Sequence, residues 1–114
     1  MKKTTLLLFC CAFIWLACSK DSDDAGLDCS TPKSFSADVN PIIQSSCAIN
    51  SGCHGTGSNM NQGPGPLTSH GEVFAAKDAI FQAVKDGTMP KTGTITVAQK
   101  NALLCWINSG APNN

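Results

Sequence analysis

Cysteine is the residue type that most constrains what this chain can fold into, because seven cysteines occur among its 114 residues. Cysteines at that density usually belong to disulfides, to a metal site or to a cofactor. The length allows one domain. Large apolar side chains are few, so their burial alone barely offsets the entropy lost on ordering the chain. We therefore expect a covalent cross-link or a large apolar group to complete the core.

The N-terminal segment predicts export. Two lysines precede an apolar run from Leu6 to Ala17, which is too short to span a bilayer and is typical of a signal peptide. The run ends in Leu16-Ala17-Cys18, which resembles the lipobox of bacterial lipoproteins, with Trp15 where that pattern prefers Leu. We therefore expect residues 1–17 to be a lipoprotein signal peptide and Cys18 to be lipidated. The alternative is an ordinary signal peptide with an incidental cysteine.

The composition of residues 18–34 predicts a tether and a lead-in to the domain. The polar, acidic stretch after Cys18 cannot pack, so we interpret it as a solvated tether. It resembles the acidic segment of surface-exported lipoproteins of the Bacteroidetes type, which implies an outer-membrane lipoprotein on the periplasmic or the cell-surface side. Without residues 1–17, six lysines and no arginine stand against eight acidic residues. That balance gives no basic surface for nucleic acid.

Residues 35–114 are expected to form one all-α domain. Helical patterns cover residues 35–47, a short stretch through Val73 and Phe74, residues 78–86, and a last helix that ends at Ser109. Three of the four starts have a candidate cap, and these are Ser36 or Asp38 for the first helix and the capping boxes Ser69–Glu72 and Thr96–Gln99.

Four apolar residues are expected to form the buried stripe of the last helix, namely Val97, Leu103, Leu104 and Ile107. Between the helices, residues 52–66 and 88–94 are rich in turn-forming and polar residues and predict long loops. Only residues 94–96 show any strand character. Long loops in so small a domain usually carry function or wrap a ligand.

The most informative motif contains two cysteines and a histidine. Covalent haem attachment normally uses the pattern C-x-x-C-H, because two thiols must reach the two vinyl groups of one porphyrin and the next residue must place an imidazole on the iron. Here five residues separate Cys47 from Cys53, and His54 follows directly. The wider spacing requires a bulge, which residues 50–52 can form.

A haem held in this way needs a sixth ligand, and Met89 is the candidate. It lies 35 residues after His54, in a loop between two predicted helices from which its thioether can point inward. Met60 and His70 are rival axial ligands, but Met60 has no apolar neighbours, and His70 begins a helix and is expected to be exposed. The alternative for Met89 itself is a side chain packed in the core.

From about Phe35 to Ala111 the chain resembles the class I cytochrome c domain. The resemblance to small lipoprotein cytochromes of Bacteroidetes rests on Ala37–Ile43, Cys47 with Cys53-His54-Gly55, Gly87–Pro90, and Trp106-Ile107 with Gly110-Ala111. It implies a cytochrome c-like fold of three to five short helices with long loops around one covalent haem c. It also implies thioethers at Cys47 and Cys53, ligands from His54 and Met89, and Trp106 packed near the haem. The widened cysteine spacing departs from the family pattern.

Other interpretations of these cysteines remain open. A local disulfide between Cys47 and Cys53 is possible, but it leaves His54 and the later Met89 unexplained. Zinc is disfavoured because adjacent Cys53 and His54 are awkward ligands for one tetrahedral ion, and no second C-x-x-C pair occurs. Once Cys47 and Cys53 are assigned together, Cys29 and Cys105 are the two cysteines left in the domain and its lead-in. We therefore predict a disulfide between them, which would tie the lead-in to the last helix.

The expected function is electron transfer and not enzymatic catalysis, because His/Met ligation saturates the iron. The protein is expected to be a monomer that passes single electrons between redox proteins and is held at the membrane by the lipid on Cys18. One rival is a haem-free, disulfide-bonded surface lipoprotein that acts as a binding module. The other is a haem peroxidase or sensor domain in which Met89 does not reach the iron.

Overall fold

The computed structural model describes residues 26–58 and 63–114. The predicted signal peptide, the lipidation site Cys18 and the rival ligand Met60 lie outside the described residues. In the two described segments the fold is all-α, as predicted, and residues 94–96 form no strand. A π-helical turn, η1 (Phe35–Val39), continues into α1 (Asn40–Ser46), and α2 (His70–Ala75), α3 (Lys77–Lys85) and α4 (Val97–Asn108) follow. No helix within these segments is long and apolar enough to cross a membrane.

The starts of α2 and α4 follow local capping chemistry. Ser69 and Thr96 each accept a hydrogen bond from the backbone N–H of the third residue of the helix, and the Glu72 and Gln99 side chains accept the backbone N–H of the cap in return, as the capping boxes predicted.

The prediction of Ser36 or Asp38 as the first cap was wrong. Ser34 is the cap, and its hydroxyl accepts a hydrogen bond from the backbone N–H of Ala37. The Asp38 carboxylate reaches back instead and accepts the backbone N–H of Ser34 at 2.7 Å. The Ser34 and Asp38 side chains thus both stabilise the helix start, and the expectation had not included Ser34.

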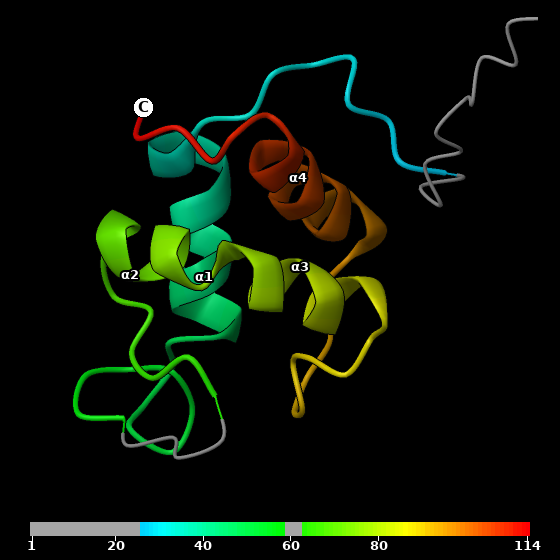
Figure 1. The fold of residues 1–114 in the computed structure, drawn as a ribbon. Coiled ribbons are helices and arrows are strands. Elements are labelled where there is room, and N and C mark those ends of the chain that lie inside the picture. Colours follow the sequence, from blue (N-terminus) through cyan, green and yellow to red (C-terminus); the bar gives the residue numbers. More distant parts are fainter. Residues whose placement is uncertain (1–25, 59–62) are drawn as a thin grey trace, which may run out of the picture.

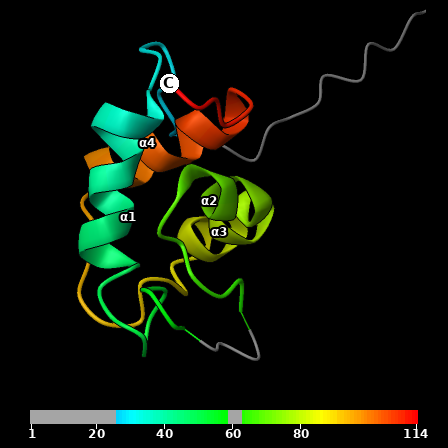
Figure 2. The ribbon, with the colours of Figure 1, turned by 90° about the vertical axis from the view of Figure 1, so that its left-hand side faces the viewer.

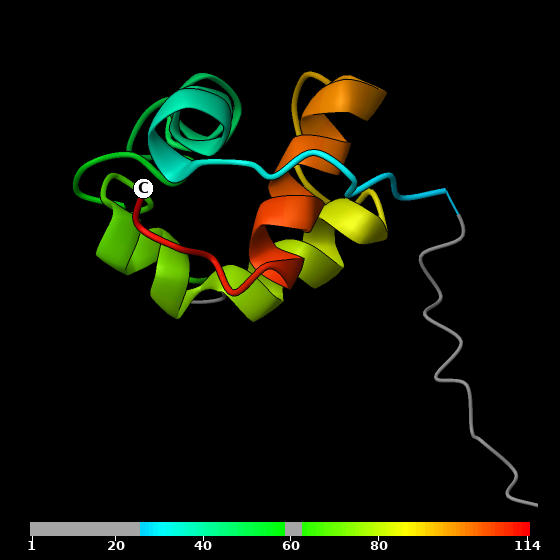
Figure 3. The same cartoon turned by 90° about the horizontal axis from the view of Figure 1, so that it is seen from above.

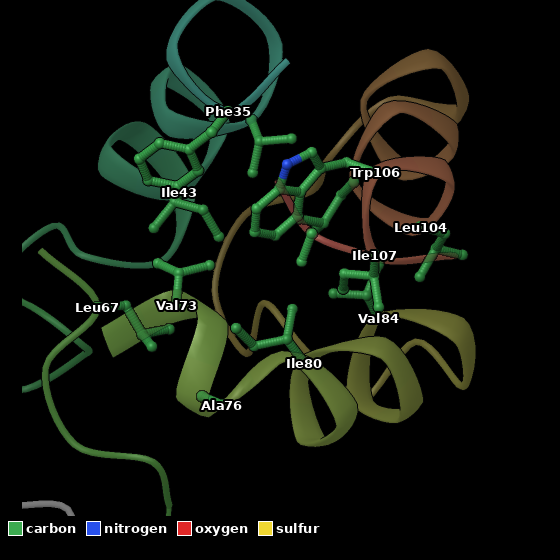
Figure 4. Close-up of a cluster of buried hydrophobic side chains, with 13 residues drawn as sticks. Phe35, Ile43, Leu67, Val73, Ala76, Ile80, Val84, Leu104, Trp106 and Ile107 are labelled. Carbon is green, nitrogen blue, oxygen red and sulfur yellow. The ribbon is translucent and has the colours of Figure 1, made fainter. Parts of the chain in front are cut away.

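The helices form two layers around one apolar core. Figure 3 shows α1 and α4 on one side and α2 and α3 on the other. Side chains from α1, α3 and α4 meet between the layers, where Trp106 lies among Ile43, Ile80 and Ile107 (Figure 4). Trp106 is fully buried, and its ring packs at 5.5 Å from the ring of Phe35. Edge and offset contacts between aromatic rings add to the stabilisation that burial provides.

Helix α4 is the central element of this core. Its residues 102–107 are all buried, because α3 and η1 pack against it from different sides. Leu103, Leu104 and Ile107 are buried as predicted, whereas Val97 is 78% exposed, so its place in the stripe was wrong. Val97 is the first residue of the helix, and a rise of about 1.5 Å per residue places it roughly 7.5 Å before the buried run that begins at Ala102.

The lead-in and the C-terminal residues close one end of the molecule. Cys29 and Cys105 form the predicted disulfide, and Leu27 packs against the core. Asn114 accepts hydrogen bonds from the backbone N–H groups of Phe35 and Ser36, which holds the C-terminal residues against η1. Figures 1 and 2 show the loops after α1 and after α3 at the opposite end of the molecule. That end carries the candidate site.

Candidate functional site

A cavity of about 1070 Å³ lies between the loop after α1, the pair α2–α3 and the loop after α3. Its volume matches the upper end of the range of roughly 300–1,000 Å³ that is usual for ligand sites. Cys47, Cys53, His54 and Met89 all line it. The fold therefore brings four of the predicted site residues to one cavity, although they come from two loops that are separated by α2 and α3.

The walls of the cavity are apolar and made largely of small residues. Leu67, Ile80 and Val84 contribute branched side chains, and all three are nearly inaccessible to solvent. Ala79 and Ala83 lie one turn apart on α3 and leave room beside them, because their side chains are single methyl groups. The sequence analysis did not predict these alanines as part of the site. The pattern that could have indicated them is that each one directly precedes a buried residue of α3.

His54 is held in one orientation. Its side chain is buried, and Nδ1 lies 2.9 Å from the carbonyl oxygen of Gly65. A carbonyl oxygen only accepts, so Nδ1 carries the hydrogen and Nε2 keeps the lone pair that binds a metal. A second bond, from Leu67 N–H to the His54 carbonyl at 2.8 Å, fixes the same loop. The sequence analysis did not identify Gly65, which precedes Pro66 and has a φ of 70°.

Cys47 and Cys53 are free thiols, and both are partly buried. Burial raises the pKa of the Cys47 thiol above its ordinary value, and the nearby charge of Cys53 raises it further. The raised pKa keeps the Cys47 thiol protonated at neutral pH, and both thiols line the cavity without a disulfide partner. The local disulfide that we considered as an alternative is not formed here, whereas Cys29 and Cys105 are joined.

Met89 reaches the cavity because the chain turns sharply after α3. Gly87 adopts a φ of 72° and ends the helix. The backbone N–H groups of Thr88 and Met89 then both donate to the carbonyl oxygen of Ala83, at 2.9 and 3.1 Å. These bonds hold the start of the loop against the end of α3, and the half-buried Met89 lines the same cavity as His54.

Trp106 does not line the cavity. Its indole Nε1 donates to the carbonyl oxygen of Pro112 at 2.9 Å, and its ring belongs to the core between the helix layers. Its predicted contact with a cofactor therefore stays a prediction. The expectation that His70 is exposed was wrong, because the ring packs edge-on against Phe35 and its Nε2 lies 3.0 Å from the carbonyl oxygen of Ala111. His70 is also absent from the cavity wall.

In residues 26–58 and 63–114, no three or more His, Cys, Asp or Glu side chains are grouped so that they could hold a metal ion. The donors in the cavity are instead one imidazole, one thioether and two thiols. No protein-family model matches the chain, and no curated protein and no solved structure matches it.

Proposed function

We propose that this protein is a c-type cytochrome, which carries single electrons through one haem attached covalently in the cavity. The observation that carries the proposal is the convergence of Cys47, Cys53, His54 and Met89 on one apolar cavity. This donor set fits a haem, because it supplies two thiols for thioethers and one axial ligand from each of two loops. The cavity volume of about 1070 Å³ is large enough for a group of that size.

Each side chain has a distinct role in this proposal. His54 presents Nε2 to the iron, and the Gly65 carbonyl fixes the ring and makes it a stronger ligand. Met89 provides the thioether ligand, which favours the reduced iron and raises the potential. Leu67, Ile80 and Val84 exclude water from the site. When bound, the haem would supply one-electron chemistry, and His54 and Met89 would be the two residues that hold its iron.

The cellular setting completes the proposal. The protein is exported and held at the outer membrane by the lipid on Cys18, on its periplasmic or cell-surface side. It acts as a monomer and exchanges electrons with redox proteins through small, transient contacts. The free thiols of Cys47 and Cys53 support this function over that of a haem-free module with a local disulfide. The position of Met89 on the cavity wall supports it over a peroxidase or sensor.

Expression of the full chain in a host that matures c-type cytochromes tests the proposal. The membrane fraction should yield a red protein whose haem stays attached after denaturation in acid and extraction with an organic solvent. A well-folded but colourless protein would contradict the proposal and favour the haem-free binding module.

Replacement of Met89 tests the assignment of the second axial ligand. In Met89→Ala the oxidised absorption spectrum should change, and cyanide should bind faster, because the iron loses a ligand. Met60→Ala is the matched control and should leave both properties as in the unmodified protein. A spectrum that responds to Met60→Ala and not to Met89→Ala would transfer the role to Met60.

A further inference from the structure

The five residues between the two cysteines form a closed side loop. The backbone N–H of His54 donates to the carbonyl oxygen of Cys47 at 2.9 Å, so the chain returns to Cys47 directly after Cys53. Residues 48–51 do not line the cavity, and Ile49 is 53% exposed. Ala48 packs against the core and Gly52 reaches the cavity wall, so residues 49–51 are the part of the loop that lies on the solvent side.

Asn50 is the centre of this side loop. Its carbonyl oxygen accepts the backbone N–H groups of Cys53 at 3.0 Å and Gly55 at 2.9 Å. Its side-chain Oδ1 accepts the N–H of Gly52 at 2.9 Å. Three hydrogen bonds on one residue thus fold the loop back and hold Cys53 in place relative to Cys47.

Gly55 makes this close return possible. A Cβ atom at residue 55 would lie 2.7 Å from the carbonyl oxygen of Asn50 and 2.8 Å from its carbonyl carbon. Both atoms belong to the backbone, so no side-chain rotation can relieve the clash. Gly55 is therefore required by the close approach of the Asn50 backbone and not by a positive φ.

We propose that Asn50 is a positioning residue that brings Cys47 beside Cys53, so that both thiols form thioethers to one haem despite the five residues between them. This inference rests on the proposed function. Each thioether forms by addition of a thiol S–H across a vinyl C=C bond, in which sulfur bonds to one carbon and the hydrogen ends on the other. Nothing leaves in this addition, and it needs no oxidant or reductant.

The number of thioethers can be counted by mass spectrometry of the mature protein. The chain has no arginine and no lysine between Lys33 and Lys77, so trypsin releases both cysteines on one peptide, residues 34–77. The protein is denatured, alkylated without reduction and digested. We expect this peptide to carry one haem and no alkylated cysteine. One haem with one alkylated cysteine overturns the inference but keeps the proposed function, and a peptide without haem overturns both.

Variants of the loop test the role of Asn50. Asn50→Ala removes the acceptor for Gly52 and should disfavour the doubly attached form about fivefold, the factor that corresponds to loss of one neutral hydrogen bond, so that part of the peptide becomes alkylated at Cys47. Gly55→Ala should increase that part further, because the Asn50 backbone must move. Asn50→Asp keeps the acceptor and should restore double attachment.

Gly71→Ala is the matched control, because a Cβ atom at residue 71 meets nothing within 4 Å. It should leave both cysteines attached, as in the unmodified protein. If Gly55→Ala does not fold, Asn50→Ala with its Asn50→Asp rescue still decides the question. Double attachment in Asn50→Ala at the unmodified level would show that the side chain of Asn50 does not position Cys47.

Discussion

Removal of the Cys29–Cys105 disulfide should destabilise the domain by a large fraction of its total stability. The two cysteines are 76 residues apart in the sequence, so their bond closes most of the domain into one loop. In the chain-entropy model a loop of that length contributes about 4–5 kcal/mol at 25 °C, because the cross-link restricts the unfolded chain. Small domains have a free energy of unfolding of only about 5–15 kcal/mol.

Cys29→Ala isolates this effect. Cys29 is exposed, so its replacement removes the bond without opening a cavity, whereas Cys105 is buried in α4. Urea unfolding of the haem-loaded protein, followed by far-ultraviolet circular dichroism, should show a loss of roughly 3–5 kcal/mol. The m value should rise, because the unfolded variant exposes more surface than a cross-linked chain.

Reduction with dithiothreitol supplies the control for this experiment. It should lower the stability of the unmodified protein to that of Cys29→Ala and should leave the variant unchanged. A loss below about 1 kcal/mol with an unchanged m value would refute the reasoning. It would show that the unfolded chain is held compact by something other than this bond.

Three further predictions concern α4 and α2. Leu103→Ala should lower the free energy of unfolding by about 2–5 kcal/mol in urea, because Leu103 is fully buried, and Val97→Ala on the same helix should change it by less than about 0.5 kcal/mol. Equal effects would contradict the packing described for α4. Ser69→Ala should cost about 1 kcal/mol in the same assay, since Ser69 caps α2. Hydrogen bonds from Thr68 lower the pKa of Glu72, so its stabilisation is present above the ordinary value of 4.5 and is lost as the pH falls through the lowered pKa. Stability measured against pH should therefore decrease on the acid side, and in Glu72→Gln that decrease should be smaller.

The helices were predictable because their ends depend on neighbouring residues. A capping box uses side chains three residues apart, so Ser69 with Glu72 and Thr96 with Gln99 could be recognised in the sequence alone. The first helix was harder, because the Asp38 carboxylate also bonds to the helix start and can be mistaken for the cap, which is Ser34. The exposure of Val97 could not be predicted, since helical periodicity does not say where along its length a helix meets its neighbours.

The candidate site was likewise predictable only in part from the sequence. The adjacent Cys53 and His54, the later Met89 and the cysteine pair Cys29–Cys105 are all visible as residue types in an order, and these follow from the sequence. Only the tertiary structure decided that Met89 faces the same cavity as His54, that Gly65 orients the imidazole, and that alanines rather than Trp106 line the wall. The physical reason is that a cavity is bounded by residues far apart in the chain. Their proximity results from how the loops after α1 and α3 lie against α2 and α3, and no local pattern records it.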